Sequence, residues 1–284
     1  MEERIYNRRT AYYLINVKAR RNQKPQHYVE AFRNLVSHDP LVQFHSEVYG
    51  SVRRVEEGEL DKEGLPYWMN LSIITYTIID PKAFYNRRNH QDIEMAWDSD
   101  IVANKKEANL YLIPKVHIVA LKKSSTITLN RVFQYLQDSL NRIEDEGFDV
   151  TIIPDSDEVQ RILEAYSIIR IDASLTYSNP LGGHSSLFRD AFDDKIRESC
   201  ADEVSISLQG STNNPLQAGE DSLVEAIVNQ ARTGNGTVDA TVKMSENSPL
   251  THIDSSDHPR ILMIEQYIRN IGYTLYNRLV TLFP

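Results

Sequence analysis

The sequence predicts an α+β protein, and three observations support that class. Alternating apolar and polar residues, typical of strands, open the folded part of the chain at residues 12–19. Apolar residues spaced three and four apart, typical of amphipathic helices, follow at 25–37 and recur later. The composition is that of a folded globular protein, with 41% hydrophobic and 25% charged residues. We therefore expect strands and helices packed around apolar cores.

Residues 1–105 are expected to form an N-terminal sheet-and-helix unit. The opening strand leads into a basic turn, after which Pro25 is suited to the first turn of a helix. Strand-like stretches rich in β-branched and aromatic residues follow at 41–55 and 66–79. The segment 82–106 has no clear period, so we expect it to connect the two halves of the protein.

Residues 106–250 are expected to form a mixed α/β unit, because strand and helix patterns alternate there. A strand at 109–121 is interrupted by a turn at Pro114, and a long amphipathic helix follows and ends at Gly147. The other predicted elements are strands at 148–153, 169–177, 203–208 and 237–244, and helices at 155–165, 185–199 and 219–232.

Residues 251–284 are expected to form a loop and a C-terminal amphipathic helix. Apolar residues in this tail step by three and four, as in the seam of a packed helix. They are Ile261, Ile264, Ile268, Ile271 and Leu275. The seam either docks on its own domain or forms the contact of a homodimer, since a terminal helix is able to reach a second subunit.

The composition excludes several classes of protein. A single cysteine, Cys200, excludes an intramolecular disulfide and a cysteine-rich zinc site, and it fits a reducing cytoplasm. The longest apolar run is far shorter than the roughly 20 residues of a membrane-spanning helix, and the charged N-terminus has no secretory signal. A net charge of −9 argues against a protein that coats nucleic acid with its whole surface. We expect a cytoplasmic protein without a membrane partner.

Positive charge is concentrated near the N-terminus, where seven basic residues and no acidic one lie between positions 4 and 29. Basic groups attract phosphates, and the interleaved Tyr12, Tyr13 and Tyr28 offer rings on which bases could stack. The alternative is an ordinary solvated face. The residues predicted to bind nucleic acid are Arg8, Arg9, Lys18, Arg20, Arg21 and Lys24.

No catalytic signature is present: the chain lacks a phosphate-binding loop, a dinucleotide fingerprint, a zinc-protease helix motif and a nucleophile elbow. We expect no cofactor, and the catalytic residues remain unknown. One cluster has metal-ligand chemistry, namely His252, Asp254, Asp257 and His258. Because it lies in a loop rich in Ser and Pro, turn and capping roles explain it more simply, and no metal site is predicted.

The alternative function is a metal-dependent nuclease. Asp80 and Lys82 have the spacing of a nuclease motif, and Asp61 and Glu63 supply further carboxylates upstream. The simpler interpretation is that Asp80 is a capping residue and Pro81 occupies the first turn of the next helix. Cleavage assays with Mg²⁺ and Mn²⁺ would separate the two interpretations.

The segment KKEANLYLIPKVHIVAL, followed by FDVTII, SIIRIDASLTYSNP, FRDAFDDKIRESCADEVSISLQG and DATVKM, resembles a bacterial family known as a domain of unknown function and encoded in mobile or defence-gene contexts. More distantly, the order of elements in the second half of the chain is similar to that of the phage-exclusion protein RexA and the anti-phage effector KwaB. The resemblance implies a nucleic-acid sensor or effector, DNA more than RNA, in anti-phage defence. A third alternative is a structural subunit with a partner protein from the same operon.

Overall fold

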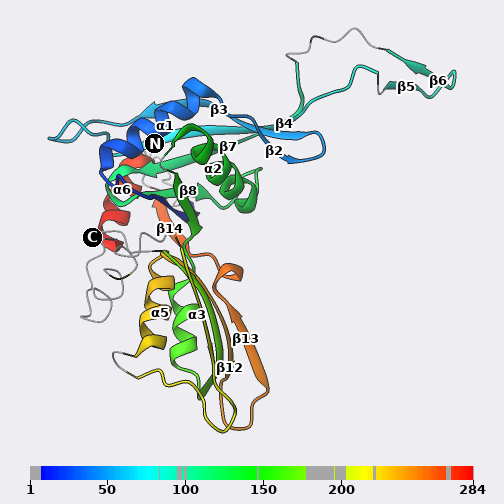
Figure 1. Cartoon of the computed structure of the whole chain (residues 1–284). Coiled ribbons are helices and arrows are strands. Elements are labelled where there is room, and N and C mark those ends of the chain that lie inside the picture. The colour runs from blue at the N-terminus through cyan, green and yellow to red at the C-terminus, as the bar shows by residue number, and fades with distance from the viewer. Residues whose placement is uncertain are drawn as a thin grey trace, which may run out of the picture.

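The structure is a computed structural model that describes residues 8–82, 84–94, 98, 101–145, 147–176, 195, 203–219, 222–266 and 270–283. In this part of the chain the strands form two main sheets and a short ribbon, and all neighbouring strands are antiparallel. Helices pack on both main sheets, so the predicted α+β class is confirmed (Figure 1).

The larger sheet has eight strands in the order β14–β1–β8–β7–β4–β3–β2, and β9 also pairs with β1. Its strands are β1 (Arg8–Ala19), β2 (Val42–His45), β3 (Val48–Glu57), β4 (Met69–Thr77), β7 (Ala103–Ile113), β8 (Ile118–Lys122), β9 (Phe148–Ile152) and β14 (Ile261–Gln266). The first half of β1 pairs with β14 and its second half with β9. The N-terminal strand β1 therefore pairs with a strand from near the C-terminus and with one from the middle of the chain.

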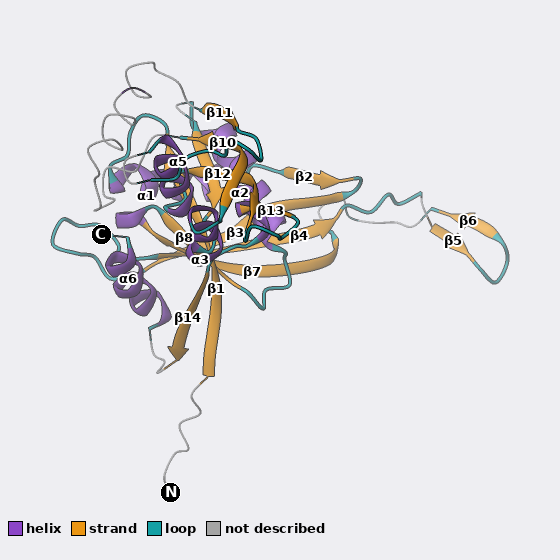
Figure 2. Ribbon diagram, turned by 90° about the horizontal axis from the view of Figure 1, so that it is seen from below, coloured by secondary structure: helices purple, strands orange, loops and turns teal. Residues whose placement is uncertain are grey.

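Both faces of the larger sheet are covered by helices. Ile15 and Val17 of β1 lie in a core with α1 (Pro25–His38) and α2 (Leu129–Ile143). Tyr12 and Leu14, which point to the opposite face, lie in a core with α6 (Ile271–Leu282). Figure 2 shows α6 apart from α1 and α2. Further along the face of Tyr12 and Leu14, Asn16 donates a hydrogen bond to the carbonyl oxygen of Gly234 in the turn after α5, and residues 14–19 of β1 are all buried.

The smaller sheet has four strands in the order β11–β10–β12–β13, and helices cover one of its faces (Figure 1). Its strands are β10 (Ser167–Leu175), β11 (Val204–Gln209), β12 (Gly236–Lys243) and β13 (Leu250–Asp254), and its helices are α3 (Ser156–Leu163) and α5 (Leu223–Arg232). Burial alternates along β12, as expected for a sheet with one solvated face. Two short 3₁₀ helices are also present, η1 (Pro114–Val116) and η2 (Ser255–Asp257).

A two-stranded ribbon projects from the end of the larger sheet, between β4 and β7. Its strands are β5 (Phe84–Asn86) and β6 (Gln91–Ile93), which pair with each other in a sheet of their own. Both views show the ribbon extending away from the rest of the molecule (Figures 1 and 2). We call this β5–β6 ribbon, residues 84–93, the arm. The segment expected to be a plain connection therefore contains a hairpin.

The C-terminal prediction is wrong in one respect. Residues 261–266 form a strand paired with β1, and the terminal helix begins at Ile271. Ile261 and Ile264 therefore do not share a helical seam with Leu275. The boundary expected between 105 and 106 falls inside β7, which pairs with β4 from Ala103 to Leu112 and with β8 from Leu110 to Ile113. The helix expected at 185–199 lies outside the described residues apart from Lys195, which is helical.

Candidate nucleic-acid interface

The predicted basic residues do not form one continuous surface. Lys18 is 1% exposed, because β9 pairs beside it and the larger sheet is covered on both faces. It cannot contact a phosphate, and this part of the prediction is wrong. Tyr12 and Tyr28 are equally buried, so their rings are not open to bases. Burial, with a smaller effect from Tyr111, raises the pKa of Tyr12 to about 12.

Two of the predicted arginines are engaged by carboxylates. Arg20 donates from Nε to Asp149 Oδ1 at 3.0 Å, so the charge of its guanidinium is largely balanced. Arg9 donates to Glu265 Oε1 at 3.2 Å across the β1–β14 pair. The side chain of Arg8 lies outside the described residues. Ion pairing therefore reduces the positive charge that this segment presents to solvent.

Arg21 and Lys24 are exposed, as the predicted binding of nucleic acid requires. Both lie in the turn between β1 and α1, and Lys24 is the N-cap residue of α1. Neither side chain forms an ion pair within the described part of the chain. The turn therefore presents two positive charges, a smaller patch than the six-residue set predicted from the sequence.

The arm presents a second pair of arginines, Arg87 and Arg88, in the turn at its tip. Both side chains are exposed, and within the described residues neither forms an ion pair. By contrast, Arg53 on β3 and Lys105 on β7 both contact Glu107 at 3.0 Å. Arg87 and Arg88 are therefore exposed cations that no carboxylate in the described residues neutralises.

Asn86 holds the turn of the arm in a defined conformation. Its Oδ1 accepts hydrogen bonds from the backbone N–H of Arg88 at 2.9 Å and of Asn89 at 3.4 Å. Its carbonyl oxygen accepts from the N–H of His90 at 2.9 Å. Tyr85 Oη lies 2.8 Å from His90 Nδ1, which joins the two strands beside the turn. These bonds fix the backbone from which the arginines project.

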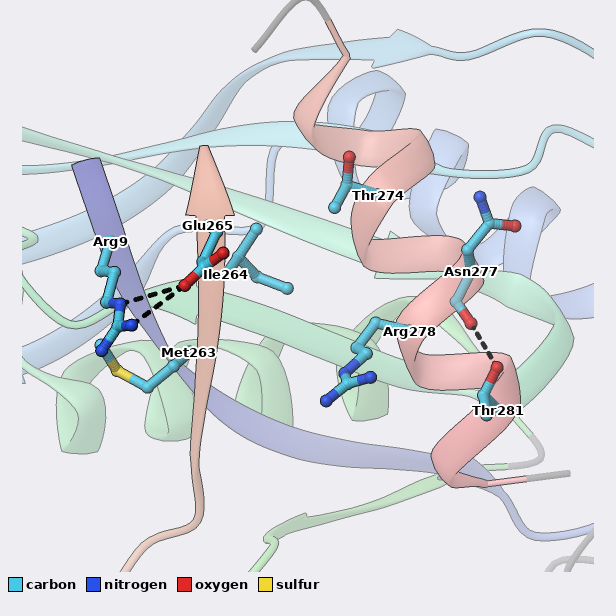
Figure 3. Close-up of a pocket in the computed structure, with 8 residues that line it drawn as sticks. All are labelled: Arg9, Met263, Ile264, Glu265, Thr274, Asn277, Arg278 and Thr281. Carbon is cyan, nitrogen blue, oxygen red and sulfur yellow. Dashed lines mark hydrogen bonds and ion pairs between the residues drawn. The ribbon is translucent and has the colours of Figure 1, made fainter. Parts of the chain in front are cut away.

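A polar pocket of about 650 Å³ lies between β14 and α6. Figure 3 shows Arg9 and Glu265 paired on the strand side, and Arg278 on the helix side. Thr274, Asn277 and Thr281 line the same helix face. The pocket includes Arg9 alone of the predicted binding set, and Glu265 balances that charge. We therefore do not treat the pocket as part of the nucleic-acid interface.

One group of side chains in the described residues has the geometry to hold a metal ion: Asp239, His252 and Asp254, with ligand atoms within 4.8 Å of one another. His252 Nδ1 lies 3.2 Å from Asp239 Oδ1. Asp257 and His258, which the sequence placed in the same cluster, do not belong to this group. Asp239 comes from β12, and only strand pairing brings it close to β13.

The nuclease-type carboxylates have local roles. Asp80 Oδ1 accepts a hydrogen bond from the N–H of Lys82 at 2.9 Å. Asp61 Oδ1 accepts from the N–H groups of Glu63 and Leu65 at 2.8 and 2.9 Å. Both aspartates therefore cap turns, as the simpler interpretation expected of Asp80, but the element that follows Pro81 is the strand β5 and not a helix. In the described part of the chain they do not join a group of three metal-ligating side chains.

Comparison with known protein families gives a match over most of the chain. The profile of the domain of unknown function DUF4747 matches residues 8–279. The chain belongs to that family. A search of curated proteins found no match. The DUF4747 match begins with β1 and ends within α6, so it includes both sheets and the arm.

The arm of this DUF4747 chain is the feature that sequence reasoning missed. Arg87, Arg88 and His90 were visible as a basic cluster, but the flanking strands have three residues each, too few for a periodic pattern. The available signal was Asn86, whose side chain favours a turn at this position. None of the described helices is long and apolar enough to cross a membrane.

Proposed function

We propose that this protein binds nucleic acid, DNA more than RNA, with the arm as its main contact. The observation that carries the proposal is the pair of exposed, unneutralised arginines at the tip, Arg87 and Arg88. Arg21 and Lys24 in the β1–α1 turn supply a second, smaller contact to phosphates. The proposal keeps two of the six residues predicted from the sequence and adds two from the arm.

Electrostatics favours an arm over a flat face for this protein. The chain has a net charge of −9, so a polyanion is repelled by much of its surface. The tip of the arm projects away from that surface (Figure 1), and physiological salt screens exposed charges over roughly 8 Å, so the repulsion felt at the tip is reduced. Each phosphate contact then releases counterions, which makes the binding salt-dependent.

The biological role we propose is recognition of phage or other mobile DNA in the cytoplasm. Its support is the resemblance to RexA, KwaB and proteins of defence-gene contexts. A single cysteine is consistent with a reducing compartment. The role requires DNA binding, so the binding experiment comes first.

The decisive experiment compares two double variants in salt titrations with duplex DNA. Arg87→Ala with Arg88→Ala removes the two charges of the tip, and the log–log salt slope should fall by about two units. Lys62→Ala with Lys115→Ala removes two exposed charges elsewhere and serves as the matched control. The control should leave the slope unchanged, and both variants should keep the thermal stability within about 0.5 kcal/mol.

Two results would contradict the proposal. The first is the absence of binding by the wild-type protein to any duplex or single strand at low salt. The second is an equal effect of the two double variants, which would assign the binding to net charge alone.

A further inference from the structure

We infer that the arm enters the major groove of B-form duplex DNA and that its arginines contact guanine bases there. The inference rests on the proposed function and narrows its ligand to one class, duplex DNA rather than duplex RNA or single strands. It also changes the role of the tip, from a charge that attracts phosphates to a group that contacts base edges.

The shape of the arm fits that groove. The B-form major groove is about 12 Å wide and admits a two-stranded β-ribbon. The paired strands of a ribbon lie about 4.8 Å apart, and the arm is such a ribbon, paired only within its own sheet. It extends from the body in both views, so the groove can be entered without a clash with the larger sheet (Figures 1 and 2). The major groove of A-form RNA is deep and narrow and excludes side chains.

The charges of the arm are polarised along its length. Arg87 and Arg88 lie at the tip, whereas Asp92 and Glu94 lie on the returning strand and just beyond it, towards the body. A polyanion attracts the tip and repels the base of the arm. This arrangement favours entry by the tip over contact along the side of the arm.

The chemistry of the tip suits base edges. A guanidinium donates two parallel hydrogen bonds to O6 and N7 of guanine, and this is the commonest specific contact in protein–DNA complexes. Asn86 and the Tyr85–His90 contact fix the turn before any ligand binds. A fixed turn lowers the entropy lost on binding, so the arginines are presented in a preorganised pair.

The experiment measures binding to four probes at one salt concentration. They are a G- and C-rich duplex whose strands are not self-complementary, the same duplex with 7-deazaguanine, an RNA duplex of the same sequence, and one of the DNA strands alone. The 7-deaza base keeps Watson–Crick pairing and lacks the N7 acceptor. Wild-type protein should bind the 7-deaza duplex at least about fivefold more weakly, and the RNA duplex at least as weakly.

A charge-preserving variant separates base contacts from phosphate contacts. Arg87→Lys with Arg88→Lys keeps both charges and removes the forked guanidinium donors. It should keep the salt slope of the wild type and lose the discrimination between the normal and 7-deaza duplexes. Thermal melting of the variant confirms that the fold is intact.

The outcomes distinguish this inference from the proposed function. Binding that is equal for all four probes leaves nucleic-acid binding in place and overturns the groove inference. No binding to any probe overturns both. If replacing residues 84–93 by a Gly-Ser linker halves the molecular mass in solution, the arm joins two copies of the chain and the inference is wrong.

Discussion

The two main sheets of this protein differ in how they are covered. The larger sheet lies between α1 and α2 on one face and α6 on the other, and its strand β1, which has paired neighbours on both sides, is buried from Leu14 to Ala19. The smaller sheet packs α3 and α5 on one face, and the polar residues of β11 and β12 face solvent on the other. Coverage, more than strand composition, decides which side chains can meet a ligand.

The difference explains why one basic prediction was wrong while other residues kept their exposure. Lys18 lies on a strand of the doubly covered sheet and is buried. Arg21 and Lys24 lie in a turn beyond that strand and are exposed, as are Arg87 and Arg88 on the arm. The four cations of the proposed interface all lie where the chain leaves the larger sheet.

The largest expected effect is a core deletion in the doubly covered sheet. Phe32 on α1 is fully buried in the core between the helices and the sheet. Phe32→Ala should lower the free energy of unfolding by about 3–5 kcal/mol, since it leaves a cavity. Phe44→Ala deletes the same atoms from a half-buried position at the sheet edge and should cost clearly less. Urea denaturation measures both, and equal losses would contradict the difference in coverage.

A backbone change tests the smaller sheet. Gly236 begins β12 with φ +141°, and a Cβ there would overlap the carbonyl oxygen of Ser174 on the neighbouring strand β10. Gly236→Ala should cost about 2 kcal/mol or more, because strain and overlap add. Gly219→Ala is the control, since a Cβ there meets nothing within 4 Å. A neutral result at Gly236 would show that the paired strands can separate locally.

Local patterns predicted most elements because those elements fold from local signals. The helix α2 follows from a continuous apolar stripe, and α3 begins at Asp155, whose side chain accepts from the N–H groups of Asp157 and Glu158. The strand β14 could not be predicted in this way. Its run Ile-Leu-Met-Ile has no period, and pairing with β1, some 250 residues earlier, makes it a strand.

The candidate site was only partly predictable for the same reason. Exposure of Arg21 and Lys24 follows from a local turn, which the sequence shows. The burial of Lys18 and the Arg20–Asp149 contact depend on β9, which pairs with β1 from about 130 residues away. The Asp239–His252 contact likewise depends on the β12–β13 pairing. Long-range pairing leaves no mark in a single sequence.

A low pH should destabilise the larger sheet around Glu107, which lies on β7. Hydrogen bonds from Ser72 and Lys105, with Arg53 nearby, lower the pKa of Glu107 to about 2. A carboxylate with a lowered pKa stabilises the fold above its ordinary pKa of 4.5, and this contribution is lost as the pH falls from about 4.5 to 2. Glu107→Gln should reduce the stability that is lost over this pH range by less than about 1 kcal/mol, because the site is partly solvated.

Melting curves between pH 5 and pH 2 measure the effect of Glu107→Gln. Glu63→Gln is the control, because within the described residues the Glu63 side chain forms no ion pair. An acid dependence that is the same in Glu107→Gln and in the wild type would assign the stabilisation of this region to packing.

The smallest effect is expected on the open face of the smaller sheet. Asp172, Asp239 and Asp254 lie directly opposite one another on β10, β12 and β13. Like charges in opposite positions repel, and solvent and the Arg170 partner of Asp172 screen that repulsion. Asp239→Asn should therefore stabilise the protein at neutral pH and low salt by no more than about 0.5 kcal/mol. The gain should shrink at about 1 M salt, where the screening length falls to about 3 Å. A loss of stability that persists at high salt would instead show that the Asp239 carboxylate is needed for its contact with His252.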